Sequence, residues 1–215
     1  RWGEAGNTLA LGYKRVISVQ SRVGSANLDT VLCSASTFNA GIGDDDTSPS
    51  LALSAPSNAE ASGFTTLMYR LSWNPDATFY IKSGSDITSC RSFVGLTASG
   101  GGAGSSDFPS GIHWIGFRYN AGTSGNGRAC SCAGGGGSNY TDVDTGVTVA
   151  TDTKYTMRFT FDGTTATFYI NGSQVATITT HLPTSTAMTY TASLYGNGAS
   201  RTWYYDRFHC VMNYA

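Results

Sequence analysis

The sequence predicts an all-β protein made of two packed antiparallel sheets, and three observations support this prediction. Large apolar residues alternate with polar ones over 155–161, the period-two pattern of a strand with one buried face. Asp162-Gly163 and Asn171-Gly172 follow two successive runs of this kind, and both dipeptides favour the tight turns of β-hairpins. Similar short runs recur along the chain without a credible amphipathic helix, which is typical of a β-sandwich.

The two turns predict the register of a three-stranded meander. If each turn is a two-residue loop, the large apolar side chains of all three strands lie on one face. A slip by one residue would turn these side chains to the opposite face, so their agreement supports the meander. The predicted cross-strand pairs are Phe159 with Ala166, Met157 with Phe168, Tyr155 with Ile170, and Phe168 with Val175.

The other predicted strands are short runs rich in aromatic and β-branched residues, bounded by turn residues. Segment 39–56 is rich in turn residues, and the glycine-rich segment 120–139 is predicted to be a surface excursion between strands. The predicted strands outside the meander are 13–19, 29–33, 64–73, 78–82, 92–96, 111–119, 145–149, 189–195 and 201–212.

Length and composition favour one domain with a weakly charged surface. The 215 residues fit a single sandwich, with strands and loops of 1–60 joining a core formed by 61–215. Charged residues make up 13% of the chain, against roughly 25% in an average soluble protein. The net charge is −1 and the basic residues are scattered, which argues against a nucleic-acid partner.

No apolar run has the length of a membrane helix, and no signal peptide opens the chain. We therefore expect no membrane partner. Because the chain begins at Arg1 rather than Met, we expect a fragment or a processed product.

The five cysteines do not form a recognisable metal-binding pattern. Cys130 and Cys132 lack the two-residue spacer of a zinc or redox motif, so loop thiols or a disulfide to a distant partner are the favoured interpretations. Cys33 with Cys210 is a conceivable pair, since terminal strands of a sandwich often lie side by side.

Three consecutive carboxylates, Asp44, Asp45 and Asp46, form the one candidate metal site. Ca²⁺ binds several oxygen ligands, and a carboxylate triplet can supply some of them. The spacing does not match an EF-hand loop, so a solvated acidic loop is the favoured interpretation. We expect no other cofactor.

The sequence offers little for catalysis. A glycosidase needs two carboxylic acids on either side of the scissile bond, yet the two glutamates, Glu4 and Glu60, lie outside the predicted strands. Asp206 is placed within a strand, and pairing with an arginine or a backbone amide explains it. The histidines lie on separate elements and no G-x-S-x-G motif occurs, so no catalytic residue is assigned.

Aromatic residues make glycan binding a better candidate, because their ring faces stack on the C–H surfaces of sugars. In Trp203-Tyr204-Tyr205, successive side chains point to opposite faces of a sheet, so at least one ring lies outside the core. Core packing and subunit contact are the alternatives for each ring. The candidate ligand-binding residues are Trp73, Trp114, Tyr119, Trp203 and Tyr205.

A series of short segments occurs in a recognisable order from residue 60 onward. They are 64–73, 93–97, 108–112, 114–119, 144–147, 155–170, Asn171-Gly172, His181-Leu182-Pro183 and 201–208. This order resembles the concanavalin A-like lectin/glucanase jelly roll, in the form common in bacteriophage tail, fibre and capsid-surface proteins. The resemblance implies a bent two-sheet sandwich that holds glycans on its concave face in sugar-binding members. Catalytic members supply glutamates from a central strand in an E-x-D-x-x-E pattern, which this chain lacks.

We therefore expect a non-enzymatic structural protein at the virion surface, in a tail, a fibre or a capsid decoration. Its partners would be other virion subunits or copies of itself in a homo-oligomer, together with a host glycan. The first alternative is a carbohydrate-binding module of a secreted, extracellular or viral multidomain protein. The second alternative is a glycoside hydrolase.

Overall fold

The computed structural model describes residues 14–20, 31–33, 38–39, 51–98, 112–134 and 139–213. The Asp44–Asp46 triplet lies outside these ranges. Within them, no group of histidine, cysteine, aspartate or glutamate residues could hold a metal ion, and no helix is long and apolar enough to cross a membrane.

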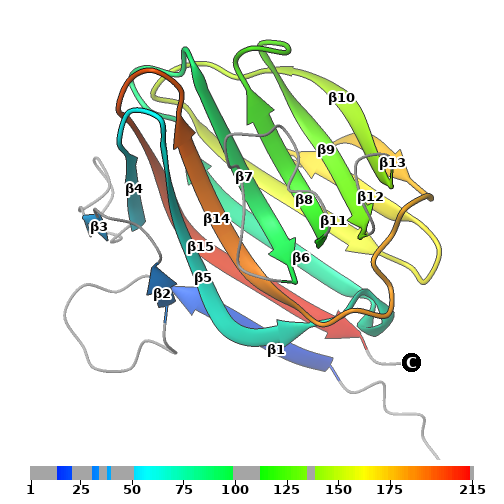
Figure 1. The fold of residues 1–215 in the computed structure, drawn as a ribbon. Coiled ribbons are helices and arrows are strands. Elements are labelled where there is room, and N and C mark those ends of the chain that lie inside the picture. Colours follow the sequence, from blue (N-terminus) through cyan, green and yellow to red (C-terminus); the bar gives the residue numbers. More distant parts are fainter. Residues whose placement is uncertain are drawn as a thin grey trace, which may run out of the picture.

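The chain forms two packed antiparallel sheets, which confirms the predicted all-β sandwich (Figure 1). The eight-stranded sheet has the order β13-β12-β11-β6-β15-β4-β3, with β1 also paired to β15. Its strands are β1 (Lys14–Gln20), β3 (Phe38–Asn39), β4 (Leu51–Ala55), β6 (Pro75–Lys82), β11 (Lys154–Phe161), β12 (Ala166–Ile170), β13 (Ser173–Ile178) and β15 (Arg201–Asn213).

The seven-stranded sheet has the order β10-β9-β8-β7-β14-β5-β2 and covers the eight-stranded sheet (Figure 1). Its strands are β2 (Val31–Cys33), β5 (Ala59–Tyr69), β7 (Cys90–Thr97), β8 (His113–Asn120), β9 (Asn126–Ala133), β10 (Tyr140–Thr148) and β14 (Met188–Gly196).

The core lies between the sheets and is rich in aromatic rings. Phe79 of β6 stacks on Phe208 of β15, with ring centroids 5.2 Å apart. Tyr190 of β14 stacks on the same Phe208 at 4.7 Å, so the ring stack joins the two sheets. Burying a side chain of this size stabilises the fold by roughly 1.5–3 kcal/mol.

The second turn of the meander confirms the predicted two-residue loop. Asn171 and Gly172 have φ angles of 50° and 83°, and Ile170 pairs directly with Ser173. The predicted pairing of Phe168 with Val175 is wrong, because a β-bulge between Phe168 and Tyr169 sets Ala176 opposite Phe168. A bulge adds one residue to one strand, and the residues of the turn do not predict it.

The first turn does not have the predicted length. Phe159 pairs with Phe168 and not with Ala166, because the loop contains four residues and not two. Asp162 holds this wider loop, since its Oδ1 accepts the backbone N–H groups of Thr164 and Thr165 at 2.9 and 2.8 Å. The error is two residues, so every side chain keeps its predicted face.

Segment 120–139 is not a surface excursion. Its central part forms β9, an inner strand of the seven-stranded sheet between β8 and β10. Small residues such as Gly127, Ala129 and Ser131 are buried in this strand. Two further errors are β4, which lies in the turn-rich segment 39–56, and residues Leu71–Trp73, which form a 3₁₀ helix and not the end of a strand.

Cys90, Cys130, Cys132 and Cys210 are free, buried thiols. The conceivable disulfide between Cys33 and Cys210 is therefore not formed. Cys130 and Cys132 lie in β9 rather than in a loop. Burial raises the pKa of Cys90 to about 12 and that of Cys210 to about 12, so both thiols stay protonated at neutral pH.

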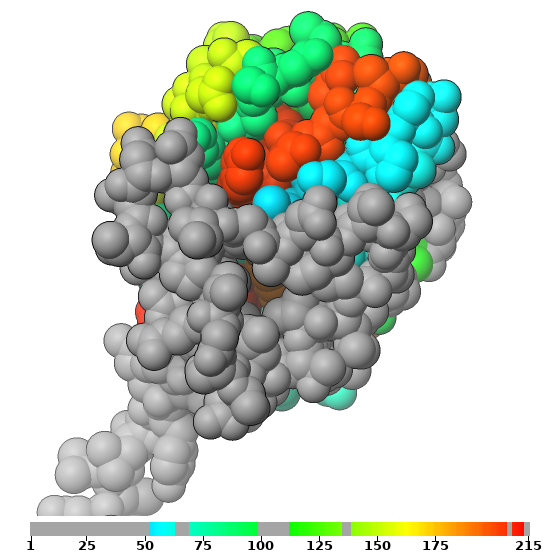
Figure 2. All heavy atoms as spheres, turned by 90° about the vertical axis from the view of Figure 1, so that its left-hand side faces the viewer, coloured from blue at the N-terminus to red at the C-terminus, as the bar shows by residue number. Residues whose placement is uncertain are grey.

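The turns at one end of the sandwich lie side by side (Figure 2). The β4–β5 turn contacts the end of β14 through the Asn58 N–H, which donates to the Gly196 carbonyl at 2.6 Å. The Asn197 N–H donates to the Ser89 carbonyl at 2.8 Å, which ties the β14–β15 turn to the segment before β7. A small hollow of about 110 Å³ lies between the start of β7, the end of β8 and the residue that follows β14.

Candidate functional site

Three of the five predicted ligand-binding residues lie in the core. Tyr119, Trp203 and Tyr205 are 6%, 1% and 2% exposed. The Tyr119 and Trp203 rings lie 5.6 Å apart, and the Tyr205 hydroxyl is 2.8 Å from the Ser92 Oγ. The alternation in β15 turns Trp203 and Tyr205 inward and leaves Tyr204 on the outer surface, as the sequence predicted.

The other two predicted residues lie apart from each other. Trp114 is on the outer face of the seven-stranded sheet but is only 2% exposed, packed in a small cluster with Phe93, Cys130 and Cys132. Trp73 is partly buried in the 3₁₀ helix, with the Arg70 guanidinium 6.0 Å from its ring. The five aromatic residues therefore do not form one site.

The outer face of the seven-stranded sheet is the side turned away from the core. On β8, Ile115, Phe117 and Tyr119 point into the core, so Trp114, Gly116 and Arg118 occupy the outer face. The three neighbouring strands β8, β7 and β14 contain no aspartate or glutamate. These three strands, as the structure describes them, therefore carry no pair of carboxylates.

Charged side chains instead gather on this face over β8, β9 and β10. We call Arg118, Arg128, Asp142 and Asp144 the charged cluster. Arg118 forms a bidentate ion pair with Asp142, with Nε–Oδ1 and Nη2–Oδ2 distances of 3.0 and 2.8 Å. Arg128 bridges the two aspartates, 2.5 Å from the Asp142 Oδ2 and 3.2 Å from the Asp144 Oδ2.

The register brings these residues together although they are far apart in the sequence. Arg118 pairs with Arg128 across β8 and β9, and Arg128 pairs with Asp144 across β9 and β10. Asp142 and Asp144 are two residues apart on β10 and therefore share one face. In the sequence, only the pattern Asp-x-Asp at 142–144 pointed to this cluster. It could not identify Arg128 as the ion-pair partner, because 120–139 was predicted to be a loop.

Burial increases across the charged cluster. The Asp144 side chain is 43% exposed, whereas those of Asp142 and Arg118 are 12% and 8% exposed. The Gly146 N–H and the Asn126 amide donate to the Asp144 Oδ1 at 2.8 and 3.0 Å. These hydrogen bonds lower the pKa of Asp144, with Arg128 as a smaller contribution. Asp144 is therefore an anion at neutral pH.

The arrangement offers a set of fixed, planar polar groups beside an aromatic ring. Tyr140 lies two residues before Asp142 on the same face of β10 and is partly buried. Planar amide, carboxylate and guanidinium groups next to an apolar surface are typical of sites that bind ligands with many hydroxyl groups. Because the groups hold one another in place, little side-chain entropy is lost when a ligand binds.

Comparison with known proteins identifies the fold. No protein-family model matches the chain, and no curated protein sequence matches it. Among solved structures, a Crh5 transglycosylase in complex with NAG is similar with a TM-score of 0.64 and 15% identity, over 94% of this chain and 84% of the other. The β-glucanase of Bacillus licheniformis is similar with a TM-score of 0.62 and 12% identity, over 92% of this chain and 98% of the other.

A third neighbour is described as an immunostimulatory antigen and pseudo β-1,3-glucanase of Mycobacterium tuberculosis. It has a TM-score of 0.56 and 10% identity, over 77% of this chain and 75% of the other. At these identities the likeness shows the fold alone. The chain therefore has the jelly-roll β-sandwich fold of these structures.

These neighbours overturn the expected function. We expected a non-enzymatic virion surface protein, yet the similar structures are a transglycosylase, a β-glucanase and a pseudo β-1,3-glucanase, and none of the three is described as a virion protein. The expectation was wrong because it rested on the scarcity of glutamate and on a phage form of the fold.

Proposed function

We propose that this protein binds a polysaccharide through the charged cluster on the outer face of the seven-stranded sheet. The observation that carries the proposal is the bridge that Arg128 makes between Asp142 and Asp144, which presents fixed hydrogen-bonding groups beside Tyr140. The neighbours suggest the ligand class, since they include a β-glucanase and a transglycosylase in complex with NAG. The side chain that remains most accessible to a ligand within the charged cluster is Asp144.

A second candidate is glycoside hydrolysis or transglycosylation at the same place, which the names of the neighbours favour. Retaining enzymes of this kind hold two carboxyl groups about 5–5.5 Å apart, one as nucleophile and one as general acid. Asp142 and Asp144 contact the same guanidinium and are the described carboxylates of the charged cluster. The lowered pKa of Asp144 suits the anionic nucleophile and not the acid.

Binding is tested by titrating mixed-linkage β-glucan and NAG oligomers into the protein in a calorimeter. Asp144→Asn keeps the shape of the side chain and removes its charge, so we expect at least tenfold weaker binding, which corresponds to about 1.4 kcal/mol. Asp162→Asn is the matched control, because Asp162 also accepts backbone N–H groups but lies in the β11–β12 turn. Equal binding by both variants would contradict the proposal.

The catalytic candidate is tested on the same two substrates by measuring new reducing ends and transfer products. Activity that disappears in both Asp142→Asn and Asp144→Asn, while Asp162→Asn retains it, would support hydrolysis or transfer at the charged cluster. Activity that survives both substitutions would place the chemistry elsewhere. Binding without reaction products would support polysaccharide binding at the charged cluster and exclude catalysis on these substrates.

A further inference from the structure

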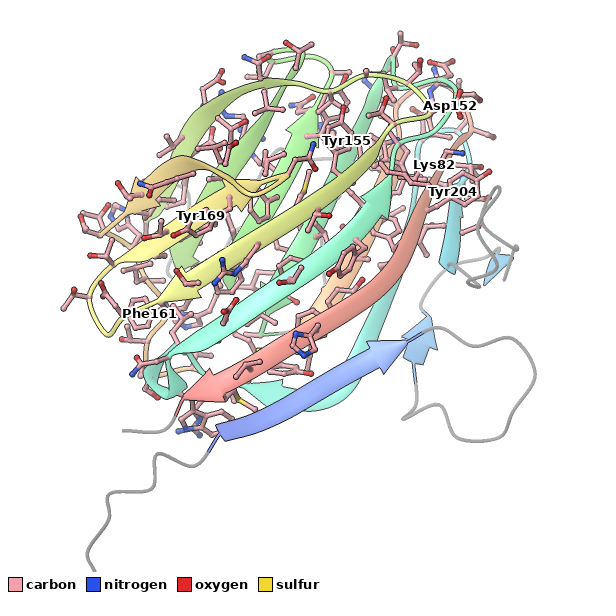
Figure 3. The ribbon with its side chains drawn as sticks, turned by 180° about the vertical axis from the view of Figure 1, so that it is seen from behind. Lys82, Asp152, Tyr155, Phe161, Tyr169 and Tyr204 are labelled. Atoms are coloured by element: carbon pink, nitrogen blue, oxygen red, sulfur yellow. The ribbon has the colours of Figure 1, made fainter. Side chains whose placement is uncertain are left out.

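We propose that the outer face of the eight-stranded sheet is a second polysaccharide-binding surface, on which three tyrosines stack on the sugar rings of a linear, uncharged chain. This tyrosine row consists of Tyr169 on β12, Tyr80 on β6 and Tyr204 on β15. It lies on the other sheet from the charged cluster, and Figure 3 shows Tyr169 and Tyr204 of the row. The inference therefore holds or fails independently of the proposed function.

The strand alternation turns all three rings outward. Each tyrosine of the row is partly exposed, whereas its two neighbours in the sequence are buried in the core. Partly exposed aromatic rings on a sheet face stand out because most of the aromatic side chains that the structure describes lie between the sheets. Rings placed in this way present a flat apolar surface with a polar hydroxyl at its edge.

The register arranges the three rings along a diagonal. Tyr169 pairs with Arg158 on β11, which pairs with Thr78 on β6. Tyr80 lies two residues further along β6, and Tyr204 pairs with Lys82, two residues beyond Tyr80. Strands about 4.8 Å apart with about 3.3 Å per residue place the Cα atoms about 12 Å and about 8 Å apart along the row. A row about 20 Å long suits an extended oligosaccharide better than a single sugar.

Two cations hold the outer rings of the row in place. The Arg158 guanidinium lies 5.1 Å from the centre of the Tyr169 ring, and the Lys82 ammonium lies 5.7 Å from that of Tyr204. Asp76 in turn fixes Arg158 through a bidentate ion pair of 2.7 and 2.8 Å. Rings that are already positioned lose less conformational entropy on binding.

The surroundings of the row favour a ligand with many hydroxyl groups. Asp76 neutralises Arg158 beside Tyr169, whereas Lys82 and its register partner Lys154 carry positive charge at the Tyr204 end. The gaps between the rings are lined by partly buried threonines, whose hydroxyl groups both donate and accept hydrogen bonds. These threonines are Thr78 and Thr156, while Thr160 and Thr167 lie on the same face beyond the Tyr169 end of the row.

The test compares variants of the tyrosine row in binding to mixed-linkage β-glucan and to NAG oligomers. We expect the double substitution Tyr169→Ala with Tyr204→Ala to weaken binding to one of them at least tenfold, and Tyr80→Ala to add to the loss. The matched double substitution to phenylalanine keeps the rings and should retain most of the affinity. Circular dichroism melting curves show whether each variant is folded.

Several outcomes would overturn the inference. Affinity that is unchanged by the alanine substitutions, or that is lost only with Asp144→Asn, excludes the tyrosine row as a binding surface. Stronger binding to alginate than to the neutral polymers, with a loss on adding salt, would show an acidic ligand instead. A change in molecular mass by light scattering without any polysaccharide binding would assign the face to contact between copies of the chain.

Discussion

Arg118 on β8 and Asp142 on β10 form a two-bond ion pair that crosses the intervening strand β9. The pair lies above Cys130, which is the register partner of both Gly116 and Asp142. It therefore ties three strands together on the face that we propose for polysaccharide binding. Both side chains are largely removed from solvent, so the loss of the two hydrogen bonds between them would be costly.

Replacing Arg118 should weaken the fold. In Arg118→Met, Asp142 keeps Arg128 but loses two charge-assisted hydrogen bonds, and we expect a loss of about 2 kcal/mol in the free energy of unfolding. Arg158→Met is the matched control, since its ion pair with Asp76 is more exposed and should contribute less than about 1 kcal/mol. Urea unfolding measures both, and equal losses would contradict this account of the charged cluster.

Gly116 should tolerate no larger residue. It pairs with Gly95 on β7, and a Cβ atom at Gly116 would overlap the Val94 carbonyl oxygen and lie 2.6 Å from the Gly95 Cα. Since these are backbone atoms, Gly116→Ala must push two central strands apart, and we expect a cost of about 3 kcal/mol.

Gly172→Ala is the control for this substitution. A Cβ atom meets nothing there, so only the positive φ of 83° opposes it, at a cost of about 1 kcal/mol. Thermal unfolding of both variants tests the difference. A smaller loss for Gly116→Ala than for Gly172→Ala would show that β7 and β8 are not packed as described.

Trp203 and Tyr204 should respond in opposite ways to substitution. Trp203→Ala empties a core site and should cost about 3–5 kcal/mol, so any loss of binding in that variant reports unfolding. Tyr204→Ala changes the outer face and should cost less than about 1 kcal/mol. Chemical denaturation checks both values, and a stable Trp203→Ala variant would contradict the assignment of Trp203 to the core.

The free thiols should make the protein less stable at alkaline pH. The folded pKa of Cys90 and of Cys210, about 12 each, lies above the unfolded value of about 8.5. Their contribution is complete below pH 8.5 and is lost as the pH rises toward 12, because the unfolded chain releases the protons first. At pH 10 the loss is on the order of 1–2 kcal/mol for each thiol.

Urea unfolding at pH 7 and at pH 10 measures this effect. Cys210→Ala should show a smaller difference between the two pH values than the unaltered protein, even though its stability at pH 7 is lower. If the difference in unfolding free energy between pH 7 and pH 10 is the same in Cys210→Ala and in the unaltered protein, the Cys210 thiol has the same pKa in the folded and unfolded states.

The sequence predicted which side chains face the core of the meander but not how far its strands are offset. Phe159 and Phe168 were assigned to the correct face, because alternation determines the face and a two-residue shift preserves it. The offset depends on Asp162, which widens the turn through side-chain hydrogen bonds that the Asp-Gly pattern does not reveal. The bulge opposite Phe168 likewise depends on local packing.

The candidate site was harder to predict than the fold. Arg128 lies in a glycine-rich segment that composition assigns to a loop, and its role appears only when β9 pairs with β8 and β10. The burial of Trp203 could not be predicted for a related reason. A large aromatic residue has the same sequence pattern whether it lies in the core, as Trp203 does, or on the outer surface, as Tyr204 does.

The most direct test of polysaccharide binding at the charged cluster is an amide NMR titration of the isotope-labelled protein with NAG and mixed-linkage glucan oligomers. We predict that the largest shift changes occur at the amides of Arg128, Asp142, Asp144 and Gly146, and that Asp144→Asn removes them while Asp162→Asn does not. If the oligomers leave these four amides unchanged at saturating concentration, the charged cluster does not bind polysaccharide.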